Sequence, residues 1–176
     1  MQLLILGLNH RTAPVDVREW VSFSREELRS GLLSLGEYDG LSGLVVLSTC
    51  NRTELYAVAD DYEQGMKALR QFLNDLEQGG DDLDEYLYTY VDDAVIRHLF
   101  RVASSLDSLV LGEGQILSQV KEAYAIAREA GTTSTVLNLL FHRAIATGKR
   151  VRTETRIARR SVSVSYAAVE LAAASL

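Results

Sequence analysis

Apolar residues recur with two different periods along the chain, and the period indicates which segments are strands and which are helices. Four short apolar runs are typical of strands, and they lie at Leu3 to Leu8, Leu44 to Leu47, Leu55 to Ala59 and Tyr86 to Val91. Two amphipathic helices separate them, one after Ser24 and one over Tyr62 to Leu76. The resulting order, β-α-β-β-α-β, predicts a ferredoxin-like arrangement in which the two middle strands form an antiparallel pair.

The first of these helices has a start signal and a stop signal. Ser24 and Glu27 have the spacing of a capping box, in which the two side chains satisfy each other's backbone N–H groups. Gly36 is a plausible end for the apolar repeat. The single proline, Pro14, disfavours helix at Ala13, so residues 9–14 are interpreted as a break after the first strand.

Beyond Asp92 the apolar period is helical throughout. Helices are predicted over Val95 to Ala103, from Ile116 to Gly131, from Val136 to about Thr155 and from Ser161 to Leu176. We therefore expect an α+β fold: a ferredoxin-like subdomain with a nucleophile loop in residues 1–91, and a helical subdomain that completes an active site in residues 92–155. Residues 156–176 would begin a helix leading to a further domain, because the pattern ends without a C-cap glycine and favours a piece of a longer protein.

The composition is that of an ordinary globular protein, with 47% hydrophobic and 24% charged residues. The N-terminus lacks a secretory signal pattern, no apolar run reaches the length of a membrane span, and a single cysteine permits no internal disulfide. These features predict a cytoplasmic protein without a membrane segment. The histidines lie far apart in sequence, at His10, His98 and His142, which predicts no metal site.

Charge is distributed unevenly along the chain. The net charge is −6 at neutral pH, yet residues 141–160 hold seven basic residues against Glu154 alone. A concentrated basic segment on an acidic protein is typical of a phosphate-binding patch. The plain alternative is a solvated helix whose cations meet acidic neighbours from the rest of the fold, and the two interpretations have similar weight.

The single cysteine, Cys50, is the most informative residue for chemistry. It follows the second predicted strand within the polar segment Ser48 to Glu54, and Arg52 lies two residues further on. A nearby cation favours the thiolate, which is the nucleophilic form of cysteine. The common alternative is a small buried side chain without chemistry. Because its neighbours are polar, the thiol belongs to the end of a strand, and we interpret it as a candidate nucleophile.

Four segments in this order resemble glutamyl-tRNA reductase. They are GLNHRTAP at residues 7–14, LSTCNRTE at 47–54, HLFRVASSLDSLVLGE at 98–113 and QILSQVK at 115–121. The resemblance covers nearly the whole chain and matches the family's N-terminal catalytic domain. It implies an NADPH-dependent oxidoreductase that begins tetrapyrrole biosynthesis, and with it porphyrin and haem biosynthesis. In the family's reaction a cysteine attacks the ester of glutamyl-tRNA, the tRNA leaves, and hydride from NADPH reduces the thioester to glutamate-1-semialdehyde.

Carried over residue by residue, the resemblance places the nucleophile on Cys50 and a motif histidine on His98, for acid–base work or for positioning. The implied substrate contacts fall on Thr49, Arg52, Ser108 and Gln115, with Glu54 and Glu113 as further candidates. His10, in the polar loop after the first strand, competes with His98 for the acid–base role, since histidine titrates near neutral pH.

The charges of a glutamyl group agree with these residues. When its α-carboxyl is esterified, the group keeps a γ-carboxylate and an α-ammonium. Arg52 offers a bidentate fork for the carboxylate. An acid is needed for the ammonium, and the sequence does not choose among Glu113, Asp107 and Glu54.

The resemblance also implies a cofactor and partners. They are NADPH, glutamyl-tRNA, glutamate-1-semialdehyde aminomutase and a second copy of the chain in a homodimer. The chain has no G-x-G-x-x-G after a strand, and Gly112-Glu113-Gly114 is not one, so we expect the NADPH-binding domain and the dimerising helices outside it. Gly114 and Ala158 depart from residues common in the family. We predict that the basic residues of 143–160 contact tRNA.

Two functions of another class stay open. The ferredoxin-like strand order is shared with RNA-recognition motifs, although their R/K-G-F/Y-G/A-F-V pattern is missing here. The second is a regulatory domain that senses haem through its thiol or one of its histidines. Transfer of a glutamyl group from tRNA to Cys50 would distinguish the enzyme from both of these binding modules.

Overall fold

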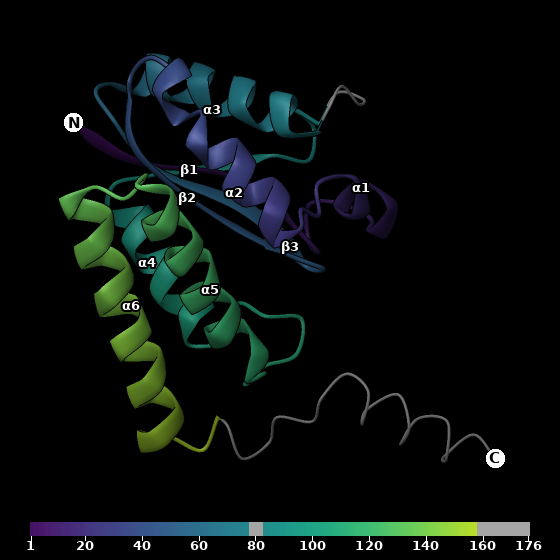
Figure 1. Cartoon of the computed structure of the whole chain (residues 1–176). Coiled ribbons are helices and arrows are strands. Elements are labelled where there is room, and N and C mark those ends of the chain that lie inside the picture. Colours follow the sequence, from purple (N-terminus) through teal and green to yellow (C-terminus); the bar gives the residue numbers. More distant parts are fainter. Residues whose placement is uncertain (78–82, 158–176) are drawn as a thin grey trace.

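A four-stranded sheet organises the computed structural model, which describes residues 1–77 and 83–157 (Figure 1). The strands are β1 (Gln2–Asn9), β2 (Leu41–Thr49), β3 (Arg52–Ala59) and β4 (Tyr88–Val91). Their order across the sheet is β2-β3-β1-β4, and each neighbouring pair is antiparallel. This is the order of the ferredoxin-like arrangement, and it confirms the predicted α+β fold class.

The helices follow the predicted sequence of elements with one addition. They are α1 (Val15–Trp20), α2 (Arg25–Leu33), a 3-10 turn over Leu35–Glu37, α3 (Tyr62–Glu77), α4 (Asp93–Ala103), α5 (Gln115–Ala130) and α6 (Thr135–Glu154). The capping box is formed at α2, where the Glu27 N–H donates to Ser24 Oγ at 3.3 Å and the Ser24 N–H donates to Glu27 Oε2 at 2.8 Å. Gly131 ends α5 in the left-handed conformation, as its position predicted.

Helix α1 is the element that the sequence pattern did not reveal. Pro14 stands at its N-cap, and Val17 is its buried residue. Proline is well tolerated at a helix start, because the N–H that it lacks would have no helical partner there. Strand β4 begins at Tyr88, two residues later than predicted, since Tyr86 still belongs to a turn. The helix predicted from Ser161 lies outside the described residues.

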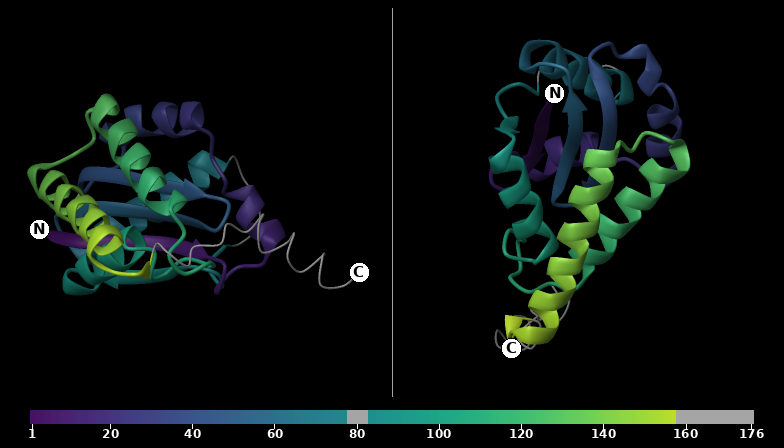
Figure 2. Two further views of the ribbon diagram at one scale, coloured as in Figure 1. Left: turned by 90° about the horizontal axis from the view of Figure 1, so that it is seen from below. Right: turned by 90° about the vertical axis from the view of Figure 1, so that its left-hand side faces the viewer.

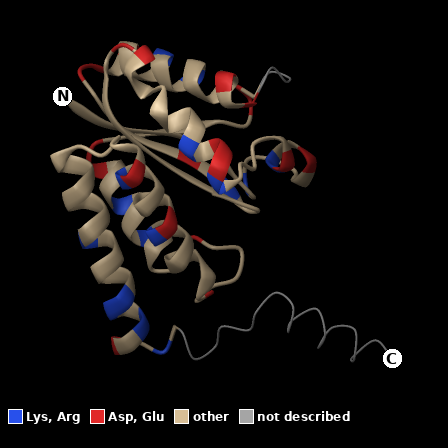
Figure 3. Cartoon of the chain, in the orientation of Figure 1, with Lys and Arg blue, Asp and Glu red and all other residues tan. Residues whose placement is uncertain are grey.

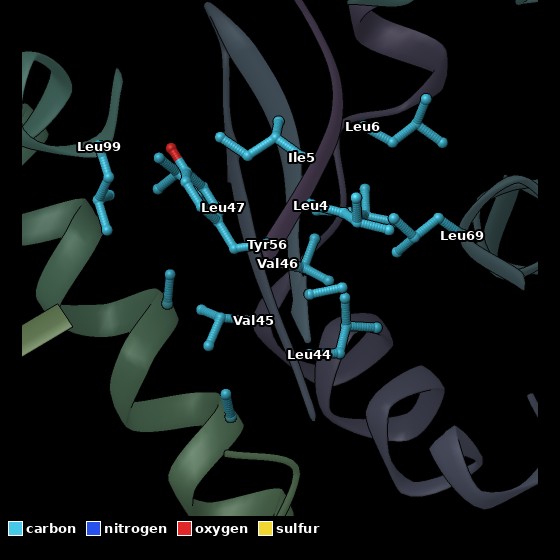
Figure 4. Close-up of a cluster of buried hydrophobic side chains, with 14 of the residues drawn as sticks. Leu4, Ile5, Leu6, Leu44, Val45, Val46, Leu47, Tyr56, Leu69 and Leu99 are labelled. Carbon is cyan, nitrogen blue, oxygen red and sulfur yellow. The ribbon is translucent and has the colours of Figure 1, made fainter. Parts of the chain in front are cut away.

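The strands send alternate side chains into two hydrophobic layers. Figure 4 shows Leu4 and Leu69 on one side of the strands and Ile5, Tyr56 and Leu99 on the other; all five are fully buried. Helix α3, with α2 beside it, covers the first face, and α4 and α6 cover the second. Helix α5 packs along β2 between α2 and α6 (Figure 2). Burial of each large apolar side chain contributes about 2 kcal/mol.

The connection between α5 and α6 forms hydrogen bonds with β2, a strand at the edge of the sheet. The Leu44 N–H donates to the carbonyl oxygen of Thr132, and the Thr132 hydroxyl donates to the carbonyl oxygen of Leu44, each at 2.8 Å. An unpaired edge strand is a template for aggregation. These two bonds use groups of β2 that would otherwise be free at the edge, and they join the helical part of the chain to the sheet.

Gly7 leaves space in the middle of the sheet. It stands opposite Glu54 on β3 and Tyr88 on β4. Directly opposed residues share a face, so the Tyr88 side chain passes over Gly7, and its hydroxyl donates to Glu54 Oε1 at 2.5 Å. A Cβ at Gly7 would lie 2.9 Å from both Glu54 Cγ and the Thr53 carbonyl oxygen, closer than packed atoms approach.

We predict that Gly7→Ala lowers the free energy of unfolding by about 1–3 kcal/mol, because the added methyl group has no space. Urea denaturation followed by circular dichroism measures the change. Gly36→Ala is the matched control, since a Cβ there meets no atom within 4 Å. Equal stability of the Gly7→Ala protein and the wild type would contradict the proposed need for this space.

Candidate active site

Cys50 and Asn51 form the two-residue turn between β2 and β3. The Thr49 hydroxyl oxygen accepts hydrogen bonds from the N–H groups of Asn51 at 3.2 Å and Arg52 at 3.1 Å, so the residue before the cysteine shapes the turn. Cys50 itself is exposed. Of the two interpretations that the sequence allowed, the structure therefore shows an accessible thiol on a turn and not a buried apolar side chain.

Two segments from the N-terminal part of the chain hold this turn. Arg18 on α1 donates from Nη1 to the Cys50 carbonyl oxygen at 2.7 Å and to Asn51 Oδ1 at 3.0 Å. The backbone N–H of His10 donates to the Asn51 carbonyl oxygen at 3.0 Å. Sequence reasoning missed Arg18. The available signal was Pro14, whose position before an apolar residue at Val17 is typical of a helix start.

Glu54 lies on β3 below the turn and is completely buried. Its carboxylate accepts from Arg52 Nη1 at 2.7 Å, the Tyr56 and Tyr88 hydroxyls at 2.5 Å each, and His98 Nε2 at 2.8 Å. Burial alone would raise the pKa of Glu54. The charge of Arg52, followed by the hydrogen bonds of His98 and Tyr56, outweighs burial and lowers the pKa to about 2. The carboxylate is therefore ionised at neutral pH.

His98 belongs to this buried network. An ionised carboxylate only accepts hydrogen bonds, so the Nε2 atom that contacts Glu54 carries a hydrogen. The His98 ring lies 4.9 Å from the Tyr90 ring and 5.8 Å from the Tyr88 ring, measured between centroids, and the residue is 8% exposed. Helix α4 thus places His98 against the sheet, where it holds Glu54.

Arg52 points its guanidinium inward, between two acids. Its Nη1 atom donates to Glu54 and lies 3.3 Å from Asp107 Oδ2, while Nη2 donates to the carbonyl and carboxylate oxygens of Asp107. Burial would lower the pKa of Arg52, but Glu54, the neighbouring tyrosines and Asp107 raise it. The sequence suggested a fork for a substrate carboxylate. In this structure both terminal nitrogens already bind acids of the chain.

Asp107 comes from the loop between α4 and α5. Its Oδ1 atom also accepts from Arg11 Nη2 at 2.7 Å. The base of the loop is closed by Ser105, which adopts a left-handed φ of 59° and donates from its hydroxyl to the Glu113 carbonyl oxygen at 2.6 Å. The loop thereby brings Asp107 to Arg52 at the start of β3 and to Arg11 just after β1.

The remaining predicted substrate contacts lie further along the chain. Gln115 is the exposed first residue of α5, and Glu113 is half-buried just before it. The Glu113 carbonyl oxygen accepts from Arg152 Nη1 at 3.4 Å, which ties this segment to the end of α6. Within the described part of the chain, neither side chain has a hydrogen bond to the Cys50–Asn51 turn. The structure therefore gathers Thr49, Arg52, Glu54 and His98 but not these two residues.

Three buried polar side-chain atoms in residues 1–77 and 83–157 have no hydrogen-bond partner. They are His10 Nδ1, Arg18 Nε and Ser108 Oγ. Each belongs to a segment that contacts the Cys50–Asn51 turn or the Arg52–Asp107 pair. A buried polar group without a partner costs about 1–3 kcal/mol.

Residues 1–77 and 83–157 contain no cluster of three His, Cys, Asp or Glu side chains able to hold a metal ion. They also contain no helix with the length and apolar character needed to cross a bilayer.

We predict that Glu54→Gln destabilises the fold by about 3–5 kcal/mol, because it removes the closer of the two acids that neutralise the buried Arg52 cation. The lowered pKa of Glu54 adds a pH dependence. The ionised Glu54 stabilises the fold fully above pH 4.5, the ordinary pKa of a glutamate. This stabilisation is lost as the pH falls toward about 2, the pKa of Glu54 in the folded protein. Urea denaturation between these pH values should show a steep loss in the wild type and a flatter one in Glu54→Gln. Glu154→Gln, at an exposed ion pair, is the control and should change little. Matching pH slopes in wild type and Glu54→Gln would refute the assignment.

Comparison with known proteins shows the family of this chain. Residues 6–155 match the family model for the glutamyl-tRNA(Glu) reductase N-terminal domain. Over 173 residues the chain is 55% identical to glutamyl-tRNA reductase of Moorella thermoacetica and 52% identical to that of Pelotomaculum thermopropionicum. Each alignment covers 98% of this chain and 39% of the relative.

A solved structure gives the same result. Glutamyl-tRNA reductase from Methanopyrus kandleri aligns with a TM-score of 0.74 and 40% sequence identity, over 97% of this chain and 39% of that chain. The chain thus spans well under half the length of the relatives that it matches. Both sequence and structure show that this chain belongs to the glutamyl-tRNA reductase family and corresponds to its N-terminal domain.

Proposed function

We propose that this chain is the part of a glutamyl-tRNA reductase that takes the glutamyl group from glutamyl-tRNA onto Cys50. The observation that carries the proposal is the exposed thiol of Cys50. The backbone of its turn accepts hydrogen bonds from Arg18 and His10, and the buried Arg52–Glu54 pair follows the turn on β3. The Cys50 sulfur attacks the ester carbonyl, the carbon–sulfur bond forms, and the bond to the ribose oxygen breaks. A thioester then stays on Cys50 and the tRNA departs.

The arrangement of charges below the turn supports a zwitterionic acyl group. Arg52 and Asp107 lie side by side with opposite charges, which fits a γ-carboxylate and an α-ammonium. Of the three acids considered for the ammonium, Glu54 is fully buried with four donors, and Glu113 makes no hydrogen bond to the turn. Asp107 is the acid we assign to the ammonium, because it binds the exposed side chain of Arg11 as well as Arg52.

The family's reduction step requires NADPH, and the described residues do not fit that cofactor. Neighbouring strands are all antiparallel, and no glycine-rich turn leads from a strand into a helix within residues 1–77 and 83–157. We derive no hydride transfer through these residues. We assign three further properties to the longer proteins that this chain matches in part: reduction to glutamate-1-semialdehyde, the homodimer and the aminomutase partner.

The basic end of α6 is the surface that we assign to the tRNA. Lys and Arg gather toward the C-terminal end of this helix (Figure 3). Lys149 and Arg150 are exposed there, and Arg150 is paired with Glu154 at 3.0 Å. Arg159 and Arg160, which completed the basic segment in the sequence, lie outside the described residues.

We predict that incubation with glutamyl-tRNA adds the mass of one glutamyl group to the Cys50 peptide, as read by mass spectrometry after rapid acid quench. Cys50→Ser should show no thioester. Glutaminyl-tRNA is the matched control, because it lacks the γ-carboxylate, and it should label Cys50 far less. An unlabelled wild-type peptide, or equal labelling of Cys50→Ser, would reject the proposed function.

Reversal of charge at Lys149 and Arg150, both to Glu, should weaken tRNA binding and reduce the slope of log affinity against log salt by about 2, since each cation accounts for about one phosphate contact. Fluorescence anisotropy of labelled tRNA over a salt series measures both. The control reverses Arg29 on α2 and Arg97 on α4, which are also exposed and carry the same charge. An unchanged salt slope in the Lys149 and Arg150 variant would contradict the assignment and indicate that the end of α6 is only a solvated helix.

A further inference from the structure

Two histidines competed in the sequence for the proton-transfer role, and the structure gives them different surroundings. His98 donates from Nε2 to the buried carboxylate of Glu54 and packs between the rings of Tyr88 and Tyr90. Its hydrogen is therefore engaged by an ionised acid at the centre of the fold. This arrangement suits a residue that maintains the network, and it leaves the exposed thiol without a proton carrier.

His10 stands beside the reactive turn. The β1–β3 register pairs Asn9 with Arg52, and the next backbone bond joins the His10 N–H to the Asn51 carbonyl oxygen at 3.0 Å. Opposed residues of antiparallel strands have Cα atoms roughly 5 Å apart. The backbone of His10 therefore lies next to Asn51, the residue that follows Cys50. Its Nδ1 atom is buried and has no hydrogen-bond partner.

We propose that His10 is the proton carrier of the Cys50 site. The inference rests on the proposed function, because it concerns the same acyl transfer. With its hydrogen on Nε2, neutral His10 presents the Nδ1 lone pair and accepts the thiol proton as the carbon–sulfur bond forms. The electron pair of the breaking ester bond goes to the ribose oxygen of the tRNA, and the proton on Nδ1 follows it. His10 ends the transfer neutral, as it began.

The charges around His10 favour this neutral starting form. Burial lowers the pKa of His10, Arg52 on β3 lowers it further, and so do Arg11 beside it and Arg18 on α1; Asp107 of the α4–α5 loop acts in the opposite direction. A neutral imidazole is the form that accepts a proton. Arg18 contributes in a second way, because it binds the carbonyl oxygen of Cys50 and so holds the backbone of the turn that also bonds to His10.

The test is a single-turnover measurement of thioester formation from glutamyl-tRNA by wild type, His10→Ala and His98→Ala across pH. We expect His10→Ala to slow the reaction by about 10²- to 10⁴-fold and to lose the inflection of the pH profile below neutral. Added imidazole should restore the rate of His10→Ala in proportion to its concentration. His98→Ala should lose stability, keep the shape of the wild-type pH profile and show no rescue.

A structural role for His10 would not produce rescue by imidazole. If His10→Ala reacts at the wild-type rate, or if imidazole rescues His98→Ala instead, the assignment to His10 is overturned. Should His10→Ala lose its fold by circular dichroism, His10→Asn provides the same comparison through its pH profile, and retention of the wild-type inflection would overturn the assignment. A wild-type chain that forms no thioester refutes the proposed function itself, and the role of His10 with it.

Discussion

The buried ionised carboxylate of Glu54 is the interaction on which the rest of the site depends. A charge inside a protein is tolerated only when it is paired and hydrogen-bonded, and Glu54 receives donors from Arg52, Tyr56, Tyr88 and His98. These donors come from β3, β4 and α4, so one side chain joins the sheet to the helical part of the chain. Burial, followed by the charge of Glu54, raises the pKa values of both tyrosines, which keeps them protonated as donors.

From Glu54 the charges alternate toward the surface. Arg52 binds Glu54 on one side and Asp107 on the other, and Asp107 binds Arg11, whose side chain is 57% exposed. Each charge is neutralised by the next, which allows a row of ions to run from the centre of the fold to the rim of the Cys50–Asn51 turn. The thiol of the turn itself stays accessible.

Much of the fold was predictable because its signals are local. Short apolar runs mark the strands, Ser24 and Glu27 mark the start of α2, and Gly131 marks the end of α5. The accessible position of Cys50 also followed from its polar neighbours. Helix α1 was missed because it is a single short stretch with one buried residue, too short for an apolar repeat to appear. The sequence likewise did not show what Gly7 does, since its role depends on Tyr88 crossing it from another strand.

By itself, therefore, the sequence determined the order of strands and helices, the resemblance to a family and the residue that carries the thiol, because each of these is encoded by neighbours along the chain. Only the tertiary structure decided what the polar side chains do. Arg52 meets Asp107 at a separation of 55 residues along the chain and His98 meets Glu54 at a separation of 44, while Arg18 reaches the Cys50 carbonyl oxygen at a separation of 32. Such contacts depend on strand register and helix packing, which fix the partner of a charged group, and a side chain's chemistry follows from that partner and from its burial.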